Sequence, residues 1–185
     1  PALDGLDVYP HTESGSIPTW IGVGGNPESV VRAARYGFSL MLAIIGGSTQ
    51  RFAPFARLFR EALAEFGFPE QPVGVHCPGH VAATDEQAQE EFFPFYRDLI
   101  ARVAKERGFR VPTRQSFIQE VGPAGALHVG SPETVARKIA DTLTALDASR
   151  FDLKYGMGGL SHAKLMTNIE LYGTKVAPLV RDMLA

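Results

Sequence analysis

The chain has 185 residues, of which 45% are hydrophobic and 21% are charged, and its formal net charge at pH 7 is −2. This size and composition suit one globular domain with a hydrophobic core. The near-neutral charge argues against nucleic acid as the main partner, because neutralising phosphates requires a basic surface. The longest apolar run, residues 38–45, is too short to cross a membrane.

Cysteine content and the start of the sequence bear on its location. Cys77 is the single cysteine, which excludes an intrachain disulfide and a zinc site built on cysteines. Residues 1–5 lack the charged and then apolar pattern of a signal peptide, and we expect a cytoplasmic protein. Because the sequence does not begin with Met and residues 5–16 are irregular, we expect the later portion of a longer protein.

The most informative stretch reads as strand, glycine turn, helix and strand. Two apolar runs, at 17–23 and 38–45, flank a helix-like segment at 30–36. Continuous apolar runs joined by a helix are typical of a parallel sheet that is buried on both faces. The turn before the helix, residues 24–29 (GGNPES), leaves backbone N–H groups free to bind a phosphate. The stretch therefore predicts a βαβ unit that carries a phosphate-bearing cofactor.

An aromatic stripe marks the next helix, which the periodicity predicts over residues 49–66. Its apolar side chains recur at steps of three and four residues, so they share one face. We expect this face to lie in the core or in a subunit interface rather than around a cofactor. Its aromatic members are Phe52, Phe55, Phe59 and Phe66.

A third strand is expected over residues 71–83, with a break at 77–79 (CPG). Thr84 then predicts the start of a helix, because Gln87 follows it at the spacing of a capping box. This helix is expected to run to about Arg107. Residues 108–127 are rich in Pro and Gly and predict an insert that lies outside the core.

The last two units begin near residue 130. Ser131 and Pro132 predict the cap and first position of a helix, residues 151–155 a fourth strand, and 161–183 a final helix. About four β-then-α units indicate the α/β class with right-handed crossovers. Eight such units close a (β/α)8 barrel, so four would form half of one and leave two unpaired strand edges. Either another chain supplies the missing strands, or the sheet is open and doubly wound.

Several segments together resemble the bacterial luciferase-like monooxygenase family. They are residues 17–22 (IPTWIG), 27–34 (PESVVRAA), 130–136 (GSPETVA), 151–155 and 169–179. Their order and spacing are similar to the C-terminal half of that family. The resemblance implies a (β/α)8 TIM barrel, of which residues 1–185 cover about strands five to eight, with the insert at about 108–127.

The resemblance also implies a function. Family members are flavin-dependent oxidoreductases that bind reduced FMN, or in some cases a deazaflavin, at the C-terminal face of the barrel. The monooxygenases use dioxygen to oxidise a small organic substrate. A flavin reductase or NAD(P)H would supply the reduced flavin, and a homodimer is expected. The expected cofactor contacts are Gly24, Gly25, Asn26 and Ser29 for the phosphate, with Ala43 and Ile44 for the ring.

The family's strands one to four have no counterpart in this sequence. In the family, that half carries the proton-handling residue near the flavin and an arginine that binds the phosphate. The catalytic residues are therefore unknown from this sequence, and the chain alone is not expected to be a competent catalyst.

Each candidate site has a plainer interpretation. The glycine turn can simply begin a helix, and Glu28 must point away from any bound phosphate. Ala43 and Ile44 suit the packing of a core strand as well as they suit a flat ring.

Three residues of the third strand suggest metal or nucleophile chemistry, which we do not expect. His76 and His80 cannot share a helix face, because Pro and Gly separate them, and no acidic third ligand is near in sequence. No base that could activate Cys77 is indicated. His76 or His80 remains a candidate for the wall of a pocket.

Two polar residues end the fourth strand. Lys154 near a flavin would stabilise its anionic form, but a lysine that reaches solvent between helices is the simpler interpretation. Tyr155 would face the side of the strand opposite to Lys154. His128 and His162 are expected at the surface.

Two function classes remain open from the sequence. The first is an enzyme, either an FMN-dependent monooxygenase or a deazaflavin-dependent reductase, that acts on a small molecule. The second is a non-catalytic flavin-binding barrel protein. Neither nucleic acid nor a membrane is expected as a partner.

Overall fold

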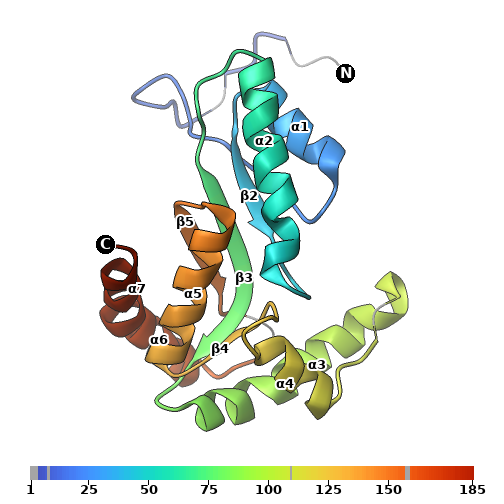
Figure 1. The fold of residues 1–185 in the computed structure, drawn as a ribbon, viewed down its shortest axis with the longest axis vertical. Coiled ribbons are helices and arrows are strands. Elements are labelled where there is room, and N and C mark those ends of the chain that lie inside the picture. The colour runs from blue at the N-terminus through green and yellow to red at the C-terminus, as the bar shows by residue number, and fades with distance from the viewer. Residues whose placement is uncertain (1–3, 8, 109, 157–158) are drawn as a thin grey trace.

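The computed structural model describes residues 4–7, 9–108, 110–156 and 159–185 (Figure 1). Its strands are β1 (Trp20–Val23), β2 (Ser39–Ala43), β3 (Val73–Val81), β4 (His128–Gly130) and β5 (Arg150–Lys154). The helices are α1 (Pro27–Arg35), α2 (Ala53–Glu65), α3 (Asp85–Arg107), α4 (Arg114–Val121), α5 (Pro132–Leu146), α6 (His162–Leu171) and α7 (Ala177–Leu184). A 3₁₀ turn, η1 (Thr49–Phe52), precedes α2, and a π turn, η2 (Tyr172–Val176), joins α6 to α7.

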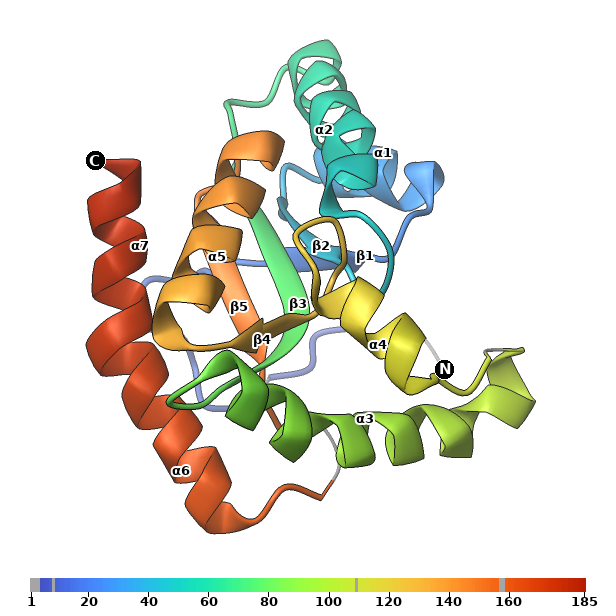
Figure 2. The ribbon, with the colours of Figure 1, turned by 60° about the horizontal axis from the view of Figure 1, so that its bottom comes forward.

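The strands form one parallel sheet in which the four main strands follow chain order. β2 lies between β1 and β3, and β5 pairs with β3 over Gly74–Pro78. The short β4 pairs with the end of β3, at Gly79–Val81. Helices α1, α2 and α5 pack side by side along one face of this sheet (Figures 1 and 2).

This topology decides between the two open arrangements. A doubly wound sheet reverses its strand order and carries helices on both faces. Right-handed crossovers that always advance in the same direction put their helices on one face, which is how a barrel wall is built. The α/β class and the consecutive barrel strands are therefore confirmed, and the doubly wound alternative is wrong.

Local sequence signals explain where the helices begin. Asn26 Oδ1 accepts the N–H of Glu28 at 2.9 Å, and Pro27 occupies the first position of α1. Ser131 caps α5 in the same way. Thr84 caps α3 through the N–H of Gln87 at 3.2 Å, but the Gln87 side chain bonds Glu91 instead, so only half of the capping box forms.

Side chains of β2 alternate between the two faces of the sheet, and those on the face covered by helices belong to the first core cluster. Leu40 and Leu42 are fully buried against the helices, as is Phe59 of α2. Phe52 and Phe55 pack partly buried against the same cluster, while Phe66 is 41% exposed. The core interpretation of the aromatic stripe thus holds for its first three members.

The expected break in the third strand is wrong. β3 runs without interruption through Cys77, Pro78 and Gly79. Pro78 is the last residue of β3 that pairs with β5, and on the other side of β3 the pairing with β2 ends at His76 and the pairing with β4 begins at Gly79, so neither β2 nor β4 needs its missing N–H. Gly79 itself is required, since a Cβ would lie 2.3 Å from the carbonyl oxygen of His128.

The insert also differs from expectation. Helix α4 lies within residues 108–127, and its Phe117 is fully buried in a second cluster with Phe92 and Leu127. His128 is not a surface residue: it lies in β4 and is fully buried. Periodicity could not reveal a three-residue strand. His162, at the start of α6, is exposed as predicted.

No helix among the described residues combines the length and apolarity that crossing a bilayer requires.

Candidate functional site

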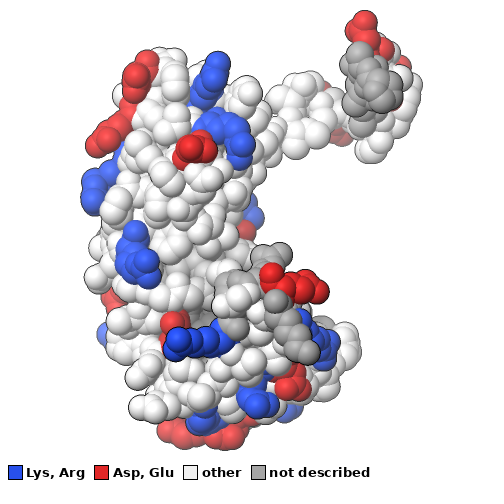
Figure 3. Space-filling model, turned by 90° about the vertical axis from the view of Figure 1, so that its right-hand side faces the viewer, with Lys and Arg blue, Asp and Glu red and all other residues white. Residues whose placement is uncertain are grey.

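The candidate site lies where the parallel strands end. The glycine turn follows β1, Ile45 and Gly46 follow β2, and Tyr155 follows β5. Because all these strands run in the same direction, the loops after them gather at one edge of the sheet, the edge at which barrel enzymes bind their ligands. Charges of both signs are scattered over the face of the molecule shown in Figure 3.

The glycine turn offers backbone donors. Gly25 has a φ of +112° and open space where a side chain would be, so only glycine suits this position. No hydrogen bond within the described part of the chain uses the N–H of Gly25 or Asn26. Ser29 Oγ accepts a hydrogen bond from Arg32 at 3.1 Å, which puts a cation beside the turn. The Asn26 side chain, in contrast, is engaged in capping α1.

The end of β2 divides its side chains between two faces. Ile44 is fully buried in the first core cluster, so its side chain has no surface to offer a cofactor. Ala43 is half-buried on the opposite face, and Ile45 is 53% exposed. We therefore expect Ile45, rather than Ile44, to contact a flavin ring. The expectation for Ala43 is unchanged.

Three residues, two of them polar, lie side by side on the inner face of the sheet, which is the face opposite to helices α1, α2 and α5. Ala43, His76 and Asp152 are consecutive partners across β2, β3 and β5. Asp152 accepts two hydrogen bonds from Arg150, at 2.9 and 3.2 Å. Burial lowers the pKa of His76 and the charge of Lys154 lowers it further, whereas Asp152 opposes the shift. His76 is thus a neutral imidazole at pH 7.

A pocket of about 560 Å³ opens beside this face, at the strand ends. One wall is an apolar stripe of α3, and the floor comes from the ends of β2, β3 and β5. The loop before α4, together with α4, closes the remaining side. The lining residues are Ile45, Gly46, Pro78, Tyr96, Leu99, Ile100, Val103, Arg110, Pro112, Glu120 and Lys154.

Glu120 fastens the insert to the strand ends. Its carboxylate accepts the N–H of Gly47 at 3.2 and 3.0 Å and the N–H of Ala126 at 3.1 Å. This contact joins α4 to the loop after β2 and so fixes two walls of the pocket relative to each other.

Lys138 of α5 in turn anchors α4. Its ammonium group donates to the carbonyl oxygens of Glu120, Val121, Gly122 and Leu127, at distances from 2.7 to 3.3 Å. A cation there satisfies the carbonyls that a helix leaves unpaired at its C-terminus. Burial lowers the pKa of Lys138 to about 8, so the group is still mainly charged at pH 7.

The other residues that the sequence singled out have structural surroundings. His80 is buried, and its Nε2 lies 3.0 Å from Glu91 Oε2, which ties β3 to α3. Burial raises the pKa of Cys77 to about 12, which is incompatible with a thiolate nucleophile at neutral pH. Within the described ranges, His, Cys, Asp and Glu form no group of three suited to a metal ion.

The position of Lys154 is compatible with both interpretations from the sequence, a solvated lysine and a cation near the ligand site. Its side chain is exposed, as a solvated lysine would be, and it also lines the pocket. Tyr155 is half-buried.

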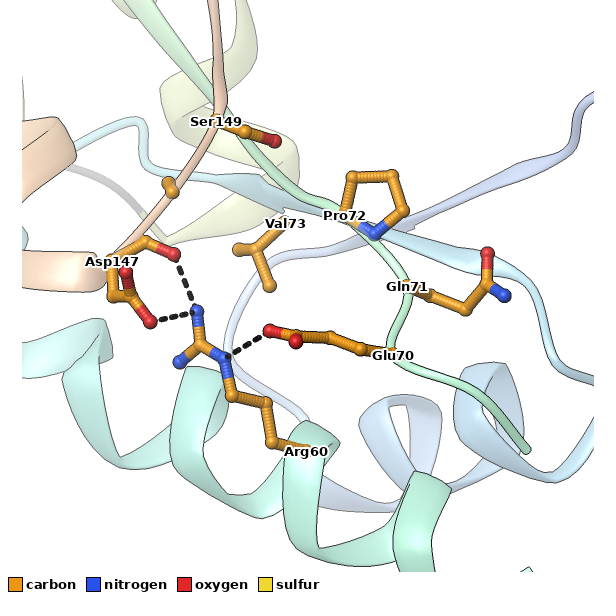
Figure 4. A pocket seen from close by; sticks show the side chains of 8 residues that line it. Arg60, Glu70, Gln71, Pro72, Val73, Asp147 and Ser149 are labelled. Atoms are coloured by element: carbon orange, nitrogen blue, oxygen red, sulfur yellow. Dashed lines mark hydrogen bonds and ion pairs between the residues drawn. The ribbon is translucent and has the colours of Figure 1, made fainter. Parts of the chain in front are cut away.

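A smaller hollow of about 380 Å³ lies at the opposite edge of the sheet, where the strands begin (Figure 4). Arg60 dominates it. Its guanidinium donates to the backbone carbonyl of Asp147, lies 3.0 Å from the Asp147 carboxylate and 3.9 Å from Glu70. These contacts join the loops before β3 and β5, so this hollow is a structural junction.

Sequence reasoning did not find four residues of the site: Tyr96, Arg110, Glu120 and Lys138. The apolar spacing of Tyr96, Leu99, Ile100 and Val103 along a predicted helix was a usable signal for the wall of the pocket. Glu120 and Lys138 act through contacts that no local pattern encodes.

Comparisons with known proteins agree with this geometry. Residues 1–149 match the family model described as luciferase-like monooxygenase. No curated protein matches the chain at a significant level. Among solved structures, the monooxygenase RslO1 from Streptomyces bottropensis is similar, with a TM-score of 0.65 and 16% identity over 86% of this chain and 47% of that one.

Two further structures differ in their cofactor. The oxygenating constituent of 3,6-diketocamphane monooxygenase from Pseudomonas putida, solved with FMN, has a TM-score of 0.60 and 19% identity over 87% of this chain and 48% of that one. The coenzyme F420-dependent tetrahydromethanopterin reductase from Methanopyrus kandleri has a TM-score of 0.59 and 19% identity over 88% and 50%. The chain therefore spans about half the length of these structures.

Proposed function

Because the chain belongs to the luciferase-like monooxygenase family, we propose that it is the C-terminal part of a flavin-dependent oxidoreductase that uses reduced FMN and dioxygen to oxidise a small organic substrate. The observation that best supports this proposal is the juxtaposition of a glycine turn and an apolar pocket at one edge of the sheet. FMN needs both features, since it joins an anionic phosphate to a flat ring.

The residues present fit such a cofactor. The N–H groups of Gly25 and Asn26, the adjoining Gly24 and the Ser29 hydroxyl would hold the phosphate, with Arg32 as a nearby cation. Ala43 and Ile45 would lie against the ring. When bound, reduced flavin supplies the electrons that activate dioxygen.

Other side chains of this chain would prepare the site. The apolar stripe of α3 excludes water from the pocket, and Lys154 offsets negative charge at the strand ends. His76, a neutral imidazole on the inner face, can donate or accept a hydrogen bond there.

A deazaflavin-dependent reductase is the second candidate. The similarity to the F420-dependent reductase above, and to an F420-dependent secondary alcohol dehydrogenase, favours it. A homodimer, a flavin reductase as electron donor and a cytoplasmic location belong to the same proposal.

Cofactor titration of the complete protein tests the proposal. We expect FMN to bind at micromolar concentration and to support oxygen consumption with NAD(P)H and a reductase above the rate of free flavin. Gly25→Asp should weaken FMN binding at least tenfold, because it brings a carboxylate to the phosphate position. Gly15→Asp, also at a positive φ with open space, is the matched control.

Three results discriminate between the classes. Tighter binding of F420 than of FMN would favour the reductase. FMN binding without oxygen consumption would favour a non-catalytic flavoprotein. A folded protein that binds neither cofactor would contradict the proposal.

A further inference from the structure

The pocket at the strand ends is apolar along one wall and cationic at its rim. Tyr96, Leu99, Ile100 and Val103 follow one another at helical spacing on α3 and all line it. Its volume of about 560 Å³ falls within the range of small-molecule sites. The wall therefore suits the apolar body of a ligand.

Two cations also line this pocket, Arg110 and Lys154. Within the described part of the chain, neither forms an ion pair or a side-chain hydrogen bond, and both are exposed. They come from different elements, Arg110 from the loop before α4 and Lys154 from the end of β5.

Among the described residues that line the pocket, Glu120 is the one acidic side chain, and its carboxylate accepts hydrogen bonds from the backbone. Both of its oxygens accept backbone N–H groups, from Gly47 and Ala126. It forms no ion pair with Arg110 or Lys154 in the described part of the chain. Arg110 and Lys154 therefore have no acidic partner among the described residues and lie next to an apolar wall.

A second hollow, of about 430 Å³, shares this rim. It includes Gly46, Tyr96, Arg110, Pro112 and Glu120, so Arg110 and Tyr96 stand where the two hollows meet. No hydrogen bond to another described residue engages the Tyr96 hydroxyl, which leaves it as a further donor at this point.

From these observations we infer that the pocket selects an apolar substrate that carries one anionic group, such as a carboxylate. The apolar body lies along α3, and the anionic group lies between Arg110 and Lys154. This inference rests on the proposed function, because it gives the flavin the glycine turn after β1 and the strand-end residues Ala43 and Ile45, and gives the substrate the rest of the pocket, along α3.

Matched ligands test the inference in the complete protein. Decanoate and decanamide share an alkyl chain and differ in charge, and their affinities can be measured by calorimetry with and without FMN. We expect decanoate to bind about tenfold more tightly than decanamide, and each of Arg110→Gln and Lys154→Gln to reduce that preference about threefold. The double variant should bind both ligands equally. Arg97→Gln and Lys175→Gln remove exposed charges outside the pocket and should change nothing.

The outcomes separate this inference from the proposed function. Equal affinity for the two ligands, or an unchanged preference in the double variant, would overturn the substrate class even if FMN binds. Loss of decanoate binding in Gly25→Asp, or its displacement by FMN, would show that the fatty acid occupies the place of the cofactor and would equally overturn the inference. If the preference for decanoate persists in a complete protein that does not bind FMN, the proposed function is overturned, and so is the assignment of the pocket to a substrate.

Discussion

The two edges of the sheet use charge in opposite ways. Where the strands begin, Arg60 is held by Asp147 and Glu70, and the hollow around it joins two loops. Where the strands end, Arg110 and Lys154 have no anionic partner among the described residues, and the pocket between them is larger and has an apolar wall. The comparison teaches that the cation at one edge, Arg60, stabilises the fold, whereas Arg110 and Lys154 at the other edge are left for a ligand.

The largest expected effect comes from removing the cation beneath the pocket. Lys138→Met removes a donor that four carbonyl oxygens share, of which those of Glu120 and Gly122 keep a backbone N–H, and we expect the free energy of unfolding to fall by about 3 kcal/mol. Urea denaturation measures it, with the exposed Lys175→Met as control. An effect below that of the control would mean that α4 does not depend on this contact.

A change of pH should destabilise the same region to a smaller extent. Burial, with the charge of Lys138, lowers the pKa of His128 to about 3. Between pH 6.5 and 3 the unfolded chain therefore binds a proton that the folded chain does not. Stability from this group is complete above pH 6.5 and is lost as the pH falls, by about 1.4 kcal/mol per pH unit.

Denaturation at pH 6.5 and 5 would measure this loss, which amounts to about 2 kcal/mol over that interval. His128→Phe keeps a ring against Phe151 and removes the titrating group, so its stability should vary less with pH. Equal pH dependence in both proteins would contradict the prediction.

The smallest effect is expected at the opposite edge. Arg60→Met removes a partly exposed ion pair and a hydrogen bond to a carbonyl, and should cost about 1 kcal/mol of stability. FMN affinity and the decanoate preference should stay at their original values, as they should in the exposed control Arg57→Met. A change in ligand affinity for Arg60→Met alone would break the contrast between the two edges.

Local patterns predicted the elements that local chemistry determines. Thr84 and Ser131 cap their helices as predicted, because a cap needs only a side-chain oxygen two or three residues before an unpaired N–H, and Asn26 caps α1 for the same reason although the sequence suggested it only as a phosphate contact. The apolar runs of β1 and β2 likewise announce buried parallel strands.

Other features depend on neighbours that lie far away in the sequence. Glu120 bonds Gly47 across 73 residues, and β4 exists only because the end of β3 is free to pair with it. Whether Ile44 or Ile45 faces the pocket follows from the register of β2, which apolar content alone does not fix. The glycine turn was found from sequence because its requirement is local, whereas the pocket was not.

Gly79 carries a consequence for how new specificity can arise on this scaffold. The segment from α3 to β4 returns to the sheet at the point where Gly79 lacks a side chain, and this gap admits the backbone at His128. The segment therefore has a fixed point of return to the sheet, in addition to the contacts of Glu91 and Glu120. Chimeras that exchange residues 85–127 between relatives, with Gly79 and His128 retained, would test whether this segment decides which ligands the pocket binds.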